Sequence, residues 1–323
     1  MADETKAPDV SVVIPCYNAE RWVGRAIDSV LAQEGVTVEV IVIDDGSTDG
    51  SVDVLRRYED RIQWETGPNR GACAARNRGL ALARADYVMF LDADDYLLPA
   101  CLSELKRQSA LDDADAAIGI AYSERASGHR KKMKGPKVTS NIVFLESWLR
   151  GKWVPPCAVL WNRESINRLG AWDDTLTKHQ DAELMMRSAI LGAKLTHCES
   201  ANSIYFEGAE GERISQKTNE RAHRDILRTR RELLSAIKGT KLDCHRVHLA
   251  IAAGLHKLEA KCLIQQQDQL AEEIKILRKE LGAPRYQGTL LHRLTCKLVG
   301  LRTKTQISKA IHNVLSSTID TTK

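Results

Sequence analysis

The sequence predicts an α/β fold: a Rossmann-like, mostly parallel sheet with helices on both faces, followed by a C-terminal helical region. Short runs rich in Val and Ile, each the length of a buried strand, recur in the N-terminal third. Stretches with apolar residues at helical spacing separate them, and Gly, Asp and Pro mark the turns. Strands that alternate with helices of this length form βαβ units, whose right-handed crossovers make a mostly parallel sheet.

The first strand is expected at DVSVVIP, residues 9–15, where proline closes a β-branched run. The helix after it, 19–33, places Trp22, Ala26 and Ile27 on one face. The second strand, VEVIVID at 38–44, is followed by DGSTDGS, which is suited to a turn and to capping a helix. The remaining elements expected in this half are a helix at 52–60, a strand at 61–67, a helix at 71–85 and a strand at 86–92.

Length and charge predict two parts. The chain has 323 residues, enough for one large domain with an appendage or for two domains. Its net charge of +4 hides an asymmetry, because residues 221–323 carry +11 and the rest carries −7. The pattern becomes helical from about residue 216. We therefore expect an α/β domain over 1–215 and a basic helical region over 216–323.

Composition excludes several classes of protein. No stretch approaches the roughly 20 consecutive apolar residues of a membrane span. The beginning, MADETKAPDV, has the character of neither a signal peptide nor a transit peptide. The eight cysteines are scattered without a CxxC pair, which argues against a disulfide framework or a zinc site. A reducing cytoplasm is the expected location.

Two acidic clusters follow predicted strands, Asp44-Asp45 and the DADD of residues 92–95. In parallel sheets ligands bind beyond the carboxyl ends of the strands, so both clusters should face one crevice. Carboxylates gathered there form a hard oxygen site suited to Mg²⁺ or Mn²⁺ together with substrate phosphates. The alternative is that they cap the helix near Pro99 or line a solvated turn. Since the neighbours from 90 to 98 include no Arg or Lys, a bound cation is the favoured interpretation.

Four motifs occur in order: SVVIPCYN, VIDDGSTDGS, NRGACAARNRGL and YVMFLDADDYLLP. This order resembles the N-terminal half of a family 2 glycosyltransferase, a nucleotide-sugar-dependent enzyme with the GT-A fold. The resemblance covers roughly residues 10–215. It implies that Asp94 is the direct ligand of Mn²⁺ or Mg²⁺ and that Asp92 lies towards the ribose and the metal. The nucleotide-binding residues that it implies are Pro15, Tyr17, Asp45, Arg76 and Asn77.

The chemistry of these residue types agrees with the resemblance. Asp45 can accept a hydrogen bond from a uracil N–H, and Tyr17 can stack on the base. The alternative for Tyr17 is an aromatic that packs on the sheet. Asp44 is expected instead to cap the following helix.

In the second half, LGAWDDTLTKHQDAELMMRSAILGAKL matches the family's acidic pair on a helix, with Gln180 in place of the commoner Glu. The resemblance then implies that Asp181 is the general base and that Arg187 ends the motif. The alternative is that Asp181 only caps this helix. Trp172 is the candidate for contacting the acceptor or supporting the site. The family's metal-binding His is absent from residues 203–216, where Glu207 or a water would have to replace it.

The C-terminal region carries two helical patterns. Leu270, Ile274, Leu277 and Leu281 have heptad spacing, which indicates a helical hairpin or a homodimer contact. Residues 281–319 have basic and apolar residues but no acidic one. This pattern fits peripheral binding to an anionic membrane surface, or a packed helix with a solvated basic face. No recognised nucleic-acid motif is present, so nucleic acid is not an expected partner.

The resemblance therefore implies a metal-dependent, inverting hexosyl- or N-acetylhexosaminyltransferase. It would move a sugar from a UDP-linked donor to a glycan or lipid-linked acceptor at the cytoplasmic face of a membrane. Two alternatives remain: a catalytically inactive nucleotide-sugar-binding scaffold of the same fold, and a nucleotidyltransferase. The second is disfavoured because PCYNAERW, after the first strand, is not a Gly-rich phosphate loop.

Overall fold

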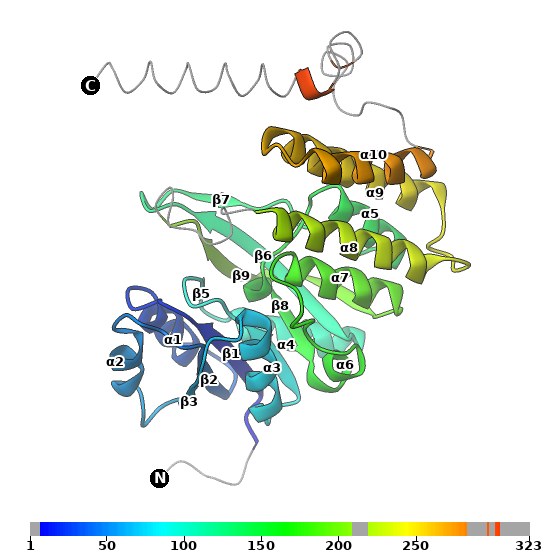
Figure 1. Ribbon diagram of the computed structural model, residues 1–323. Coiled ribbons are helices and arrows are strands. Elements are labelled where there is room, and N and C mark those ends of the chain that lie inside the picture. The colour runs from blue at the N-terminus through cyan, green and yellow to red at the C-terminus, as the bar shows by residue number, and fades with distance from the viewer. Residues whose placement is uncertain (1–6, 209–218, 283–295, 297–300, 304–323) are drawn as a thin grey trace. The chain divides into compact units, whose positions relative to one another are not determined.

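The computed structural model describes residues 7–208, 219–282, 296 and 301–303 (Figure 1). The chain divides into two compact units: residues 1–148 with 152–217, and residues 149–151 with 218–323. The domain boundary predicted between 215 and 216 lies outside the described residues.

In the described part of the chain, nine strands form one sheet in the order β3-β2-β1-β4-β8-β6-β9-β5, with β7 paired to β6. The strands are β1 (Val10–Cys16), β2 (Val38–Asp44), β3 (Gln63–Thr66), β4 (Tyr87–Phe90), β5 (Tyr96–Leu97), β6 (Ala116–Glu124), β7 (Arg130–Lys132), β8 (Val159–Asn162) and β9 (Leu195–Phe206). The helices are α1 (Val23–Leu31), α2 (Ser51–Arg56), α3 (Ala72–Leu82), α4 (Cys101–Asp112), α5 (Asn141–Leu149), α6 (Arg163–Arg168), α7 (Gln180–Ile190), α8 (Glu220–Ile237), α9 (His245–Ile264) and α10 (Asp268–Glu280).

The α/β class is confirmed, and the parallel arrangement holds for the first four strands. β1 pairs in parallel with β2 and β4, and β2 with β3. β8 then pairs antiparallel with both β4 and β6, while β6 and β9 are parallel. β2 has the predicted bounds, while several other elements are shorter than predicted, as in α2, which ends at Arg56 instead of residue 60. Periodicity marks the middle of an element better than its ends.

Adjacent side chains on a strand point to opposite sides, so the apolar strands of this sheet have two apolar faces. Helices cover both of them. On one face, Met89 of β4 belongs to a core cluster with apolar residues of α1, α2 and α4. On the other face, Phe90 packs edge-on against Trp172, with ring centroids 5.1 Å apart. α3 also lies on this second face, where Gly79 approaches Val13 of β1. Loops at the strand ends are thereby fixed from both sides of the sheet.

In the second unit, the helices α8, α9 and α10 pack in sequence order, and Figure 1 shows α9 and α10 alongside each other. Leu270 and Ile274 of the predicted heptad stripe are buried in this unit, which agrees with the helical hairpin. No helix among the described residues is long and apolar enough to cross a membrane. The basic segment 281–319, predicted to contact a membrane, lies almost entirely outside the described residues.

The contact of α3 with β1 gives a testable prediction. A Cβ added at Gly79 would lie 2.2 Å from Cγ1 of Val13, inside a packed layer. Because close-packed interiors resist added volume, we expect Gly79→Ala to lower the free energy of unfolding by about 1–3 kcal/mol. Urea denaturation measures the change.

Gly67→Ala is the matched control, because a Cβ at that position meets nothing within 4 Å. It should change the free energy of unfolding by about 1 kcal/mol or less, in the stabilising direction if its backbone suits Ala. Equal destabilisation by both substitutions would contradict close packing of α3 on β1.

Candidate active site

The carboxyl ends of β1, β2 and β4 lie side by side at one edge of the sheet. Parallel pairing places Cys16, the last residue of β1, beside Asp44, the last residue of β2. It also places Val13 beside Phe90, where β4 ends. The acidic segments predicted from the sequence leave the sheet at this edge, where ligands of parallel sheets bind.

Hydrogen bonds hold the loops after β1 and β2 together. Asn18 has a left-handed backbone with φ 49°, and its Oδ1 accepts a bond of 2.8 Å from the amide of Thr48. Its own amide donates to Oγ of Ser47 at 2.9 Å. The side chain of the preceding Tyr17 is 41% exposed, while Pro15 is half-buried. The side chain of Tyr17 is therefore accessible to a ligand.

The two aspartates after β2 have different partners. The carboxylate of Asp45 accepts bonds from the amides of Arg70, at 2.7 Å, and Gly71, at 2.8 Å. These bonds fix the turn that leads into α3. Asp44 accepts a bond of 2.6 Å from the hydroxyl of Thr66, so it braces β3. The expectation that Asp44 caps the following helix was wrong, because α2 has no side-chain cap.

Arg76 on α3 is the centre of the site. Its Nη2 contacts Oδ1 of Asp92 at 2.5 Å, and its Nη1 donates to Oε1 of Gln180 at 3.3 Å. Its guanidinium lies over the ring of Trp172, 4.5 Å from the centroid, and the side chain is only 7% exposed. Burial opposes the charged form, but the carboxylates of Asp92 and Asp181 raise the pKa of Arg76. The arginine therefore joins the DADD segment to the beginning of α7.

This ion pair corrects one expectation. The sequence around the DADD segment offers no cation, but the fold supplies one from 16 residues earlier in the chain, where Arg76 pairs with Asp92. The resemblance placed Arg76 and Asn77 near the base and ribose. In this structure Arg76 is buried, and both polar groups of the Asn77 side chain bond to the backbone of Trp172, at 2.8 and 3.0 Å.

The other aspartates of the segment differ in exposure. Asp95 is fully buried, and its Oδ1 accepts a bond of 2.9 Å from the amide of Phe206 in β9. Burial and the charges of Asp94 and Asp92 raise its pKa well above the ordinary value. Its Oδ2 is enclosed without a hydrogen-bond partner among the described residues. Asp94 is half-buried, and its backbone carbonyl accepts a bond of 2.7 Å from Arg25.

Glu207, the suggested replacement for the missing metal-binding His, pairs with Arg125 at 3.5 Å. Within residues 7–208 and the described part of the helical unit, no group of three or more His, Cys, Asp or Glu side chains is arranged to hold a metal ion. Asp92 and Asp94 are the partly exposed carboxylates of the DADD segment.

Asp181 lies in the first turn of α7, after His179, whose backbone is left-handed with φ 62°. Desolvation raises the pKa of the Asp181 carboxyl, although a bond from the amide of Ala182 and the charge of Arg76 oppose the shift. Its interaction with Arg76, which also binds Asp92, places it in the same site as the DADD segment.

Trp172 is only 4% exposed, which favours the supporting role over contact with the acceptor. Its ring lies between Phe90 and Arg76, so it supports the site from within. The enclosed indole N–H has no hydrogen-bond partner in the described part of the protein.

Arg187 also has a supporting position. Its guanidinium donates to the carbonyls of Leu169 and Ala171, the latter at 2.6 Å, and pairs with Glu183 at 2.6 Å. These contacts tie α7 to the loop that carries Trp172. Arg187 therefore fixes the helix of Asp181 and does not itself reach towards the DADD segment.

Arg25 was not among the predicted site residues. It lies on the helix predicted at 19–33, and its charge there has no local feature that distinguishes it from a solvated residue. Trp22 lies three residues before Arg25 in the same predicted helix, whereas the proximity of Tyr96 required the fold.

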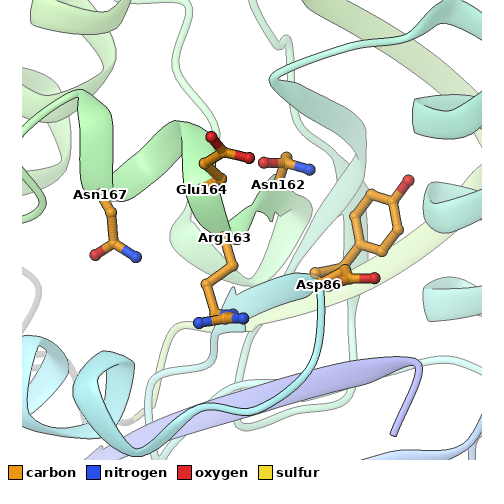
Figure 2. Close-up of a pocket in the computed structure, with 6 residues that line it drawn as sticks. Asp86, Asn162, Arg163, Glu164 and Asn167 are labelled. Carbon is orange, nitrogen blue, oxygen red and sulfur yellow. The ribbon is translucent and has the colours of Figure 1, made fainter. Parts of the chain in front are cut away.

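A separate pocket of about 520 Å³ opens at the opposite edge of the sheet (Figure 2). It is lined by Asp86, Tyr87, Asn162, Arg163, Glu164 and Asn167. These residues lie where β4 begins and where its antiparallel neighbour β8 ends. None of the predicted site residues lines it.

The raised pKa of Asp181 gives a prediction about stability. A carboxyl whose pKa is raised by folding favours the native state while protonated and opposes it once ionised. The ordinary pKa of this carboxyl is 3.8. As the pH rises above it, ionisation of Asp181 therefore destabilises the native state increasingly. We expect Asp181→Asn to raise the melting temperature at pH 8, by roughly a few degrees, and the gain to shrink towards pH 4.

Asp92→Asn is the contrasting variant in the same thermal scans. It leaves the buried Arg76 without its ion-pair partner, so we expect the free energy of unfolding to fall by about 1–3 kcal/mol at pH 8. If Asp181→Asn were destabilising at pH 8 to the same extent, Asp181 would not be a strained carboxylate.

Comparison with known proteins agrees with this geometry. The family model described as "Glycosyl transferase family 2" matches residues 11–162. The succinoglycan biosynthesis protein ExoO of Rhizobium meliloti is 31% identical over 215 residues, covering 62% of this chain and 61% of that protein. ExoU of the same organism is 32% identical over 202 residues, covering 58% of each. The chain thus spans about three fifths of the length of these two relatives.

Solved structures share the fold. S. aureus TarS, residues 1–349, in complex with UDP-GlcNAc has a TM-score of 0.62 at 18% identity, covering 77% of this chain and 72% of that one. The same fragment in complex with UDP has a TM-score of 0.60. Residues 11–162 include the segments that leave the carboxyl ends of β1, β2 and β4. Residues 11–162 belong to glycosyl transferase family 2, and the α/β unit that contains them has the GT-A fold.

Proposed function

We propose that this protein is an inverting glycosyltransferase that moves a sugar from a UDP-linked donor to a hydroxyl of a glycan or lipid-linked acceptor. The observation that carries the proposal is the contact of Arg76 with both Asp92 and Gln180. It brings the carboxylates at the end of β4 and the Asp181 helix into one site. Such a transferase needs both a site for the donor diphosphate and a proton acceptor.

The UDP-linked donor is supported by the exposed Tyr17 and by Asp45. An exposed phenol ring at a strand end can stack on a nucleobase, and a carboxylate fixed by two amides is a preorganised acceptor for a uracil N–H. The TarS structures that share the fold were solved with UDP and with UDP-GlcNAc.

A divalent cation fits the charges at the end of β4. Asp92, Asp94 and Asp95 lie together, and burial together with the charges of Asp94 and Asp92 raises the pKa of Asp95. The enclosed Oδ2 of Asp95 has no hydrogen-bond partner among the described residues. Mn²⁺ or Mg²⁺ prefers such oxygen ligands and commonly takes the rest from phosphates and water. Asp94 would hold the ion, with Asp92 beside it. When bound, the ion would neutralise charge on the leaving diphosphate.

Asp181 is proposed as the general base. It accepts the proton of the acceptor hydroxyl while that oxygen forms a bond to C1 of the donor sugar. The bond from C1 to the diphosphate oxygen breaks, and UDP leaves with the electron pair. Desolvation strengthens the carboxylate as a base, and the charge of Arg76 favours its ionised form.

The role of Asp181 is tested by UDP release from UDP-sugars in the presence of Mn²⁺. Asp181→Asn keeps the shape of the side chain but cannot accept the proton, so turnover should fall by about 100- to 10,000-fold. Binding of UDP should be unchanged. Asp113→Asn, at a fully exposed side chain, is the matched control and should keep wild-type turnover.

If the wild-type protein binds nucleotide sugars but releases no UDP above the level of Asp181→Asn, the protein is an inactive scaffold. That result would agree with Gln180 standing where the family commonly has Glu.

The cation is tested by thermal shift with UDP, GDP and dTDP, each with and without Mn²⁺. A ligand at 100 times its dissociation constant stabilises the native state by about 2.7 kcal/mol. We expect stabilisation by UDP that increases with Mn²⁺ and loses this dependence in Asp94→Ala. Equal stabilisation by all three nucleotides, or no effect of Mn²⁺, would contradict the proposed donor or the proposed ion.

A further inference from the structure

Arg25, on α1, is enclosed by aromatic rings. Its guanidinium carbon lies 4.4 Å from the ring centroids of both Tyr96 and Phe206, and 5.3 Å from that of Trp22. Arginine stacks on ring faces through its planar, weakly hydrated charge. These three rings come from the N-cap of α1, from β5 and from the end of β9, so the arginine joins parts of the chain that are distant in sequence.

The rings are themselves held in place. The hydroxyl of Tyr96 donates to both carboxylate oxygens of Glu124, at 2.9 Å each. Arg130 contacts the same Glu124 at 2.5 Å and donates to the Tyr96 hydroxyl at 2.9 Å. The cage around Arg25 is therefore part of a bonded network and not a loose apolar patch.

Within this cage, Nη2 of Arg25 donates to the backbone carbonyl of Asp94 at 2.7 Å. Its Nε is enclosed and has no hydrogen-bond partner among the described residues. The Asp94 carbonyl belongs to a tight turn, in which the amide of Asp95 donates to the carbonyl of Asp92 at 2.9 Å. The arginine therefore fixes the orientation of the peptide between Asp94 and Asp95.

We propose that Arg25 is a positioning residue that holds the Asp94 peptide, and with it the Asp94 carboxylate, in the orientation that binds the cation and the donor diphosphate. This inference rests on the proposed function. Arg25 touches neither ligand and acts through the backbone of Asp94. A group that orients a metal ligand in this way commonly affects metal affinity by about 10- to 100-fold.

The holding contact is tested first, without any ligand. In hydrogen exchange, Arg25→Met keeps the apolar stem but removes the donors, so the amides of Asp95, Leu97 and Leu98 should exchange about tenfold faster. Arg25→Lys keeps the charge and a hydrogen-bond donor, so it should restore part of the protection of these amides against exchange. Arg56→Met is the control. Arg56 lies on α2, its side chain is 61% exposed, and it pairs with its helix neighbour Asp53.

The link to the ligand is tested by titrating Mn²⁺ in the presence of UDP. We expect the dissociation constant of Mn²⁺ to rise about 10- to 100-fold in Arg25→Met, less in Arg25→Lys and not at all in Arg56→Met. The affinity for UDP without a cation should stay at the wild-type value in all three. Melting temperatures recorded in parallel show whether each variant is folded. If Arg25→Met is unfolded, the result is decided by Arg25→Lys.

The outcomes separate this inference from the proposed function. Unchanged exchange at residues 95–98, or unchanged Mn²⁺ affinity in a folded Arg25→Met, would overturn the role of Arg25 while leaving the transferase proposal intact. A wild-type protein that binds no nucleotide with Mn²⁺ would overturn the proposed function, and the role of Arg25 towards the ligand would fall with it. Faster local exchange in Arg25→Met would then show only a structural contact.

Discussion

The candidate site depends on one buried cation, the guanidinium of Arg76. Burying a charge is costly unless it is paired and hydrogen-bonded, and here the pairing comes from Asp92 at the end of β4. The ring of Trp172 covers one face of the guanidinium, and the field of Asp181 favours its charge. No one of these groups is near Arg76 in sequence. The ion pair therefore exists only when α3, the end of β4 and the start of α7 are all in their native places.

A second arginine acts on the same acidic segment from the other face of the sheet. α3 carries Arg76 on one face, while α1, whose apolar residues join the opposite core cluster, carries Arg25. Arg76 binds a side chain, the carboxylate of Asp92, and Arg25 binds a main-chain carbonyl, that of Asp94. Asp95 completes the anchoring through its bond to the amide of Phe206. The carboxylates at the strand edge are thus held close together in spite of their repulsion.

Residues around the site divide into those that are open and those that are committed to the scaffold. Tyr17 is open, and Asp94 is half-buried. Asn77 and Arg187 instead use their polar groups to hold the segment around Trp172. A motif of this kind also has to build the site, and a side chain with its polar groups bonded inside the protein serves that purpose.

The sequence by itself determined the α/β class, the strands that lead into the site and the order of the family motifs. These depend on local features, namely β-branched runs, helical periodicity and turn residues. The tertiary structure decided which partners the charged groups have, because Arg76 meets Asp92 and Gln180 across 16 and 104 residues, and Arg25 meets Asp94 across 69. It also decided that Trp172 is buried. Local pattern records which residues can be buried or charged, but only the packing of distant segments fixes which of them meet.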